Sequence, residues 1–177
     1  MTASPPSPAD PERADLLSGL GAARHFLRFT VRDLTDEQAR QRTTASELTL
    51  GGLVKHVAAI EQGWAGFVLD GPSALGDFSA MSEADMTRWA DQFKLLPGET
   101  LAGVLAGYEK VAQRTDDLVA SLPDLNLSHP LPNAPWFPPG ERRSARRVFL
   151  HIIAETAQHA GHADIIRESL DGAKSMG

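Results

Sequence analysis

ELTLGGLVKHVAAIEQGWAGFVL, residues 47–69, carries the clearest structural signal in the chain. Apolar side chains recur there at steps of three and four, which is the repeat of one face of an α-helix. The stripe contains Leu50, Leu53, Val57, Ile60, Trp64, Phe67 and Val68. Ser46 is a suitable N-cap for this helix, and Asp70-Gly71-Pro72 ends it. A stripe this broad predicts that the helix packs lengthwise against other helices.

Three further segments repeat this pattern and predict long helices. The segments are 11–34, 99–121 and 144–171. Ser144 can cap the last helix, and Gly172 stands where a C-terminal glycine belongs. Four long helices favour an all-α four-helix bundle, which we expect to occupy residues 11–177 as one domain.

The connection between the second and third long helices, residues 70–98, determines the expected topology. It is long enough to cross the bundle, so these two helices are expected to be parallel, in an up-down-down-up order. A short helix is expected within this crossover at residues 82–93, with Ser82 as its N-cap.

Two other segments lack helical periodicity. Residues 1–10 are rich in Pro, Ser and Ala and are expected to be disordered. The Pro-rich stretch 123–143 is expected to be a long loop, and a loop of this length in a compact domain is usually functional or disordered. His129 lies in this loop, and we expect it to be solvated. The pattern predicts no strand.

Composition narrows the class of protein. The 177 residues are 42% hydrophobic and 23% charged, with a net charge of -6, as in ordinary globular domains. Without a long basic run, neither nucleic acid nor a membrane is expected as a partner. No apolar stretch is long enough to span a membrane and no secretory signal is present, so a cytoplasmic location is expected. The chain has no cysteine, so any thiol must come from another molecule.

Histidines and one glutamate are concentrated on the last predicted helix. Glu155 and His159 stand at positions i and i+4. His151 and His162 extend the same stripe on either side. A carboxylate and an imidazole at this spacing can chelate a divalent metal, and His56 on the second helix can supply a third ligand. Two imidazoles and one carboxylate leave coordination positions free, which is typical of a catalytic metal site.

Each of these ligand candidates also has an ordinary structural interpretation. His56 lies among core-facing residues, and it can be a core histidine whose ring nitrogens are hydrogen-bonded. A Glu-x-x-x-His pair is also common on solvated helix faces. The spacing alone therefore leaves both interpretations open.

Aromatic and basic residues offer candidates for a substrate pocket. Trp64, Trp136 and Phe137 can wall a pocket, or they can pack in the core and anchor the loop. A basic cluster at the start of the last helix consists of Arg142, Arg143, Arg146 and Arg147. This cluster can meet an anionic substrate or form a solvated basic face, and Arg146 is our candidate within it.

GGLVKH at 51–56 and ETAQHAGHADIIRE at 155–168 resemble the DinB-like superfamily. They resemble most closely its actinobacterial branch, related to the N-terminal metal-binding domain of mycothiol-dependent maleylpyruvate isomerase. The resemblance covers about residues 12–172 and implies an up-down-down-up four-helix bundle that forms homodimers. That isomerase has a further C-terminal domain beyond this region, so isomerase activity itself is not expected.

The resemblance also implies a ligand set. His56, Glu155 and His159 take the positions of the metal ligands, with Glu155 where most members carry a histidine. His151 and His162 are expected either to surround these ligands or to take part in catalysis.

The implied chemistry is thiol transfer. A low-molecular-weight thiol such as mycothiol is expected to coordinate a divalent metal, zinc before nickel or iron, and to lose its proton. The thiolate then attacks an electrophile, which makes a thiol S-transferase of detoxification type the leading expectation. Two alternatives stay open, namely a non-catalytic, stress-related metal-binding dimer and a metal-dependent hydrolase with His162 as the base.

Overall fold

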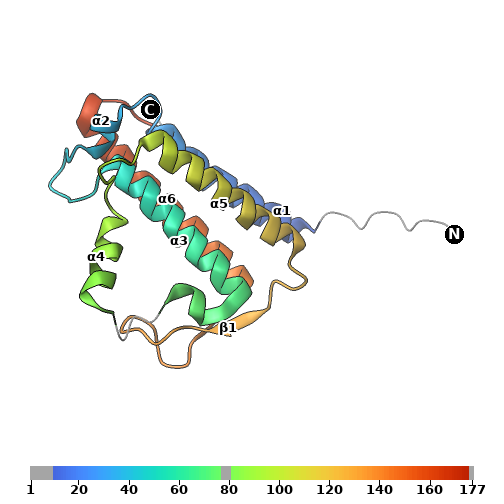
Figure 1. Cartoon of the computed structure of the whole chain (residues 1–177). Coiled ribbons are helices and arrows are strands. Elements are labelled where there is room, and N and C mark those ends of the chain that lie inside the picture. The colour runs from blue at the N-terminus through green and yellow to red at the C-terminus, as the bar shows by residue number, and fades with distance from the viewer. Residues whose placement is uncertain (1–9, 77–80, 176–177) are drawn as a thin grey trace.

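The computed structural model describes residues 10–76 and 81–175, which are mostly helical, as predicted. Four long helices lie side by side (Figure 1). These are α1 (Pro11–Thr30), α3 (Leu50–Asp70), α5 (Leu101–Ser121) and α6 (Ala145–Asp171). The shorter elements are α2 (Asp36–Arg40), the 3-10 helix η1 (Gly71–Leu75), α4 (Glu83–Asp91), β1 (Ser128–Pro130) and β2 (Arg142–Ser144).

Side chains at the helix ends explain where the helices begin and stop. Ser82 and Ser144 cap α4 and α6, and Gly172 ends α6 in the left-handed conformation, all as predicted. The predicted disordered segment 1–10 lies outside the described residues except for Asp10. That residue instead caps α1, where its carboxylate accepts a hydrogen bond from the Glu12 amide at 3.1 Å.

The predicted start of α3 at Ser46 is wrong. Thr49 is the N-cap, and its hydroxyl accepts a hydrogen bond from the Gly52 amide at 3.2 Å. Ser46 belongs to the turn before the helix. Its carbonyl accepts a hydrogen bond from the guanidinium of Arg42, and its hydroxyl accepts one from the Leu48 amide. The helix therefore starts at Leu50, which is fully buried.

The loop at 123–143 contains a short antiparallel ladder, so the expectation of no strand is wrong. Ser128 pairs with Ser144 and Pro130 with Arg142. Strands of three residues are too short to show the alternating pattern by which strands are recognised. His129, which we expected to be solvated, is half-buried on β1, and its Nε2 lies 3.2 Å from the carbonyl oxygen of Val68.

The core of the described residues has two apolar parts separated by a polar layer. One part surrounds Phe67 and Phe149, and the other surrounds Leu53. Between them, Arg24 of α1 reaches Glu61 of α3 through two hydrogen bonds of 3.2 and 2.5 Å. Both residues are buried. Although burial opposes the charge of Arg24, the carboxylates of Glu61 and Asp116 outweigh it and raise the pKa of Arg24. This layer ties α1 to α3 in the middle of the structure.

Gly52 brings the segment after α4 onto the start of α3. A Cβ at this position would lie 1.9 Å from the carbonyl oxygen of Phe93 and 2.5 Å from its carbon, so only glycine fits. This close approach of the two backbones holds Phe93 against α3 at Gly52, which lies one turn before His56 on the helix.

Candidate metal centre

Three of the predicted site residues come together between α3 and α6. The Nε2 atoms of His56 and His159 lie 3.7 and 3.4 Å from the same carboxylate oxygen, Oε1 of Glu155. One potential ligand atom from each residue lies within 4.8 Å of the other two. Glu155 and His159 meet because they are one turn apart on α6, and His56 faces them from α3.

The spacing and chemistry of these side chains fit a divalent metal. Two ligands of a tetrahedral zinc ion are about 3.3 Å apart when each lies about 2.0–2.1 Å from the ion. The two nitrogen–oxygen separations are close to this value and longer than an ordinary hydrogen bond. Two imidazole nitrogens and one carboxylate oxygen also form a donor set that zinc accepts.

The environment of His56 does not match that of a satisfied core histidine. The residue is only 5% exposed, and its Nδ1 is buried with no hydrogen-bond partner among the described residues. The ring of Phe93 stacks on the imidazole, with 4.1 Å between the centroids and 22° between the planes. Burying an unpaired ring nitrogen is costly, so a strong interaction at Nε2 is needed to compensate.

Glu155 is the charged member of the group. The imidazoles of His159 and then of His56 hold the pKa of its carboxyl well below the ordinary value, although burial alone would raise it. The carboxylate is therefore anionic at neutral pH and available to a cation. Its side chain is about a quarter exposed (25%), so the group is open to solvent on one side.

His162 and His151 lie around this group without belonging to it. Nδ1 of His162 is 3.3 Å from Nδ1 of His159, on the side of that ring away from Glu155. A partner at this position fixes the orientation and tautomer of His159. His151 packs edge-on against Trp64, with ring centroids 4.9 Å apart. Burial and then the charge of Arg143 lower the pKa of His151, which favours its neutral form.

The predicted pocket residues have different surroundings. Trp64 is buried beside His151, whereas Trp136 is 61% exposed and its ring centroid lies 6.1 Å from that of Phe137. Arg146 is hydrogen-bonded to Glu12 and, at 2.6 Å, to Asn126. It therefore connects the first turns of α1 and α6 and is not part of the histidine group.

Sequence reasoning missed Phe93 and chose a different arginine of the basic cluster. The guanidinium of Arg143 lies 4.9 Å from the ring centroid of Trp64 and 5.2 Å from that of Phe137. Its Nη1 is buried without a hydrogen-bond partner in the part of the chain that the structure describes, and its Nε lies 3.5 Å from Oε1 of Glu141. Arg143 lies in the short strand β2, before the N-cap of α6, and the sequence pattern did not predict this strand.

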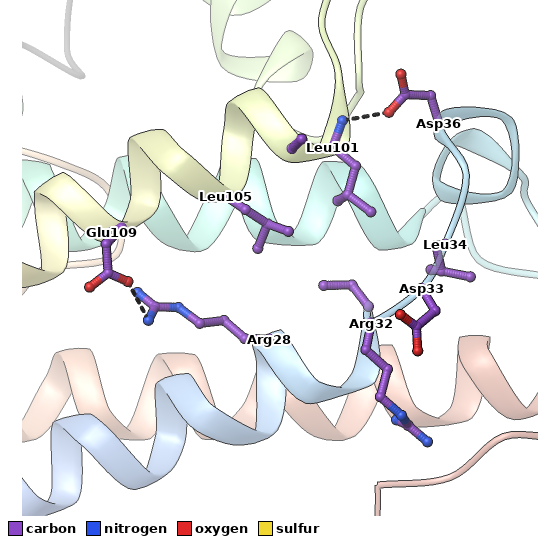
Figure 2. Close-up of a pocket in the computed structure, with 10 residues that line it drawn as sticks. Arg28, Arg32, Asp33, Leu34, Asp36, Leu101, Leu105 and Glu109 are labelled. Atoms are coloured by element: carbon purple, nitrogen blue, oxygen red, sulfur yellow. Dashed lines mark hydrogen bonds and ion pairs between the residues drawn. The ribbon is translucent and has the colours of Figure 1, made fainter.

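A separate cavity of about 400 Å³ lies between the end of α1 and the start of α5 (Figure 2). Arg28 and Glu109 form an ion pair of 2.5 Å across it, and Asp36 accepts a hydrogen bond from the Leu101 amide at 2.7 Å. None of the predicted site residues lines this cavity. Two of its acidic groups, Asp36 and Glu109, have structural partners, and the cavity holds no histidine, so the histidine group is the better candidate site.

The fold and this group define a mostly helical protein with two histidines and one glutamate on neighbouring helices. A family model described as mycothiol-S-transferase matches residues 15–172. The chain therefore belongs to the mycothiol S-transferase family, which is a DinB-like family. None of the curated proteins compared with the chain matches it. Among the described residues, no helix is both long and apolar enough to cross a membrane.

Proposed function

We propose that the protein is a divalent-metal-dependent S-transferase that joins mycothiol to an electrophile. The observation that supports this most strongly is the meeting of His56, Glu155 and His159 in a chain of the mycothiol S-transferase family. The absence of cysteine fits the same chemistry, because the sulfur then comes from the co-substrate.

A divalent cation, zinc before nickel or iron, lowers the pKa of a bound thiol and so supplies thiolate at neutral pH. His56, Glu155 and His159 would hold that cation. His162 keeps the ring of His159 oriented through the contact between their Nδ1 atoms. In the overall reaction, the S–H bond is replaced by an S–C bond. The proton leaves with the departing group or is added to the product.

We assign Trp64, His151 and Arg143 to the surroundings of this group. Trp64 packs against His151, and the guanidinium of Arg143 lies against the ring of Trp64. A neutral His151 does not compete with the metal for the carboxylate of Glu155.

The hydrolase alternative requires His162 to act as a free base. The contact of its Nδ1 with His159 supports a positioning role instead. A non-catalytic metal-binding protein is the outcome expected if the protein binds metal without turning over mycothiol.

We further propose the up-down-down-up bundle and a cytoplasmic homodimer. The helix order is supported by Figure 1, in which α3 and α5 both begin at the end of the molecule that carries α2. The hydrogen bond from Leu101 to Asp36 supports the same arrangement. Sedimentation equilibrium tests the dimer, because a single species with the mass of one chain would contradict it.

Turnover with mycothiol tests the enzymatic proposal. Purified protein is incubated with zinc, mycothiol and a bimane electrophile, and the thioether is quantified. We expect turnover by the wild type and by Glu168→Gln, an acid exchange elsewhere on α6, and none by Glu155→Ala. Equal rates in wild type and Glu155→Ala would refute the proposed role of the metal group.

A further inference from the structure

A cavity of about 330 Å³ lies where the crossover segment faces α3. Ala59, Ile60 and Gly63 form its wall on α3. The opposite wall comes from α4 and its C-cap, through Arg88, Trp89 and Gln92. None of the roles assigned above uses this cavity.

The cavity adjoins the metal centre through a chain of aromatic contacts. Phe93 stacks on His56 at 4.1 Å, and Trp89 packs edge-on against Phe93 at 5.3 Å. On α3, Ile60 and Gly63 follow His56 at i+4 and i+7, so the cavity lies along the same face of the helix. Gly63 is about 10 Å along the helix axis from His56. A ligand with one end at the metal centre can therefore place its other end in the cavity.

The lining of the cavity suits a neutral ligand rich in hydroxyl groups. Trp89 is 51% exposed, which is unusual for an indole and leaves a flat apolar face available. Asp85 and Arg88 form an ion pair, so their charges cancel. Hydrogen bonds from Ser82, together with Arg88, lower the pKa of Asp85 and keep it ionised. The remaining guanidinium N–H groups and the amide of Gln92 can donate to or accept from hydroxyls.

We propose that this cavity binds the polyhydroxylated rings of the thiol co-substrate, with Trp89 stacked on one ring and Arg88 and Gln92 contacting hydroxyls. Mycothiol has this form, because its cysteinyl group is attached to a glucosaminyl-inositol unit. The inference rests on the proposed function for the position of the sulfur, which lies at His56, Glu155 and His159. It adds a site that selects the thiol by its sugar end.

Kinetics with two thiols tests this assignment. Trp89→Ala is expected to raise KM for mycothiol about tenfold, the effect of truncating one aromatic anchor. It should leave KM for free cysteine, which has no ring, unchanged. Trp89→Phe should restore most of the affinity. Met86→Ala is the matched control, because Met86 is an exposed residue of α4 that does not line the cavity. Equal KM values for mycothiol in Trp89→Ala and Met86→Ala would overturn the proposal.

A binding experiment separates this inference from the proposed function. Ligand-observed NMR with glucosaminyl-inositol, which has no thiol, is carried out on the full chain without an electrophile. Binding by wild type and Met86→Ala, and its loss in Trp89→Ala, would support the cavity even if no transferase turnover is found. No binding by the wild type, or equal binding by Trp89→Ala, would overturn the cavity assignment while leaving the metal centre to its own test.

Discussion

Replacing Gly52 with alanine perturbs both the fold and the candidate site. The new Cβ would lie 1.9 Å from the carbonyl oxygen of Phe93, whereas ordinary contact begins at 3.4 Å. The obstructing atoms belong to the backbone, so the segment must retreat by more than about 1 Å. Overpacking of this kind costs about 1–3 kcal/mol. The gain in helix propensity from replacing glycine offsets at most about 1 kcal/mol of that. We expect a net loss of about 1–2 kcal/mol.

Guanidinium unfolding of Gly52→Ala measures this loss, and Gly107→Ala is its control. Gly107 lies within α5 and has no atom within 4 Å of an added Cβ, so alanine there should stabilise by about 0.5–1 kcal/mol. Retreat of Phe93 should also remove its stacking on His56 and weaken zinc binding. If Gly52→Ala is as stable as Gly107→Ala, the close approach of Phe93 to α3 is refuted.

Three further perturbations address the core and the site. Arg24→Leu leaves the buried Glu61 unpaired and should lower the free energy of unfolding in urea by about 3–5 kcal/mol. Adding Glu61→Leu should recover much of this loss. Additive losses in the double variant would contradict the coupling. Because burial and Arg143 lower the pKa of His151, this residue binds a proton more readily in the unfolded state than in the folded state. The free energy of unfolding should therefore fall as the pH drops below about 6.5, and it should fall less in His151→Asn. An identical pH dependence in the wild type and in His151→Asn would contradict this. His162→Ala should weaken zinc binding by about 10–100-fold, because His159 loses the partner at its Nδ1, and unchanged affinity would exclude that role.

The helices and the Glu155–His159 pair were predictable because they depend on local periodicity. Spacing along one helix sets which side chains share a face, and Ser82, Ser144 and Gly172 mark helix ends through their own backbone or side-chain chemistry. The approach of His56 to this pair is a long-range contact. The sequence pattern offered His56 as a third ligand but left the structural alternative open, and the assignment came from the resemblance to a family.

Most of the missed features depend on contacts between segments that are separate in the sequence. Phe93 reaches His56 only because Gly52 lets two backbones approach closely, and nothing in the residues around Phe93 indicates this. The prediction of Ser46 as N-cap missed the local turn in which Arg42 binds the carbonyl of Ser46, after which Thr49 caps the helix. The short strands placed Arg143 next to Trp64, and a three-residue ladder has no recognisable pattern.

Calorimetric titration of the metal-free protein with zinc tests the metal centre most directly. The wild type and His25→Ala, which changes an exposed histidine of α1, are expected to bind one ion per chain. His56→Ala should bind it more than about 100-fold more weakly, beyond the usual effect of losing an outer partner of a ligand. Absence of binding by the wild type, or unchanged affinity in His56→Ala, would contradict a metal centre built from α3 and α6.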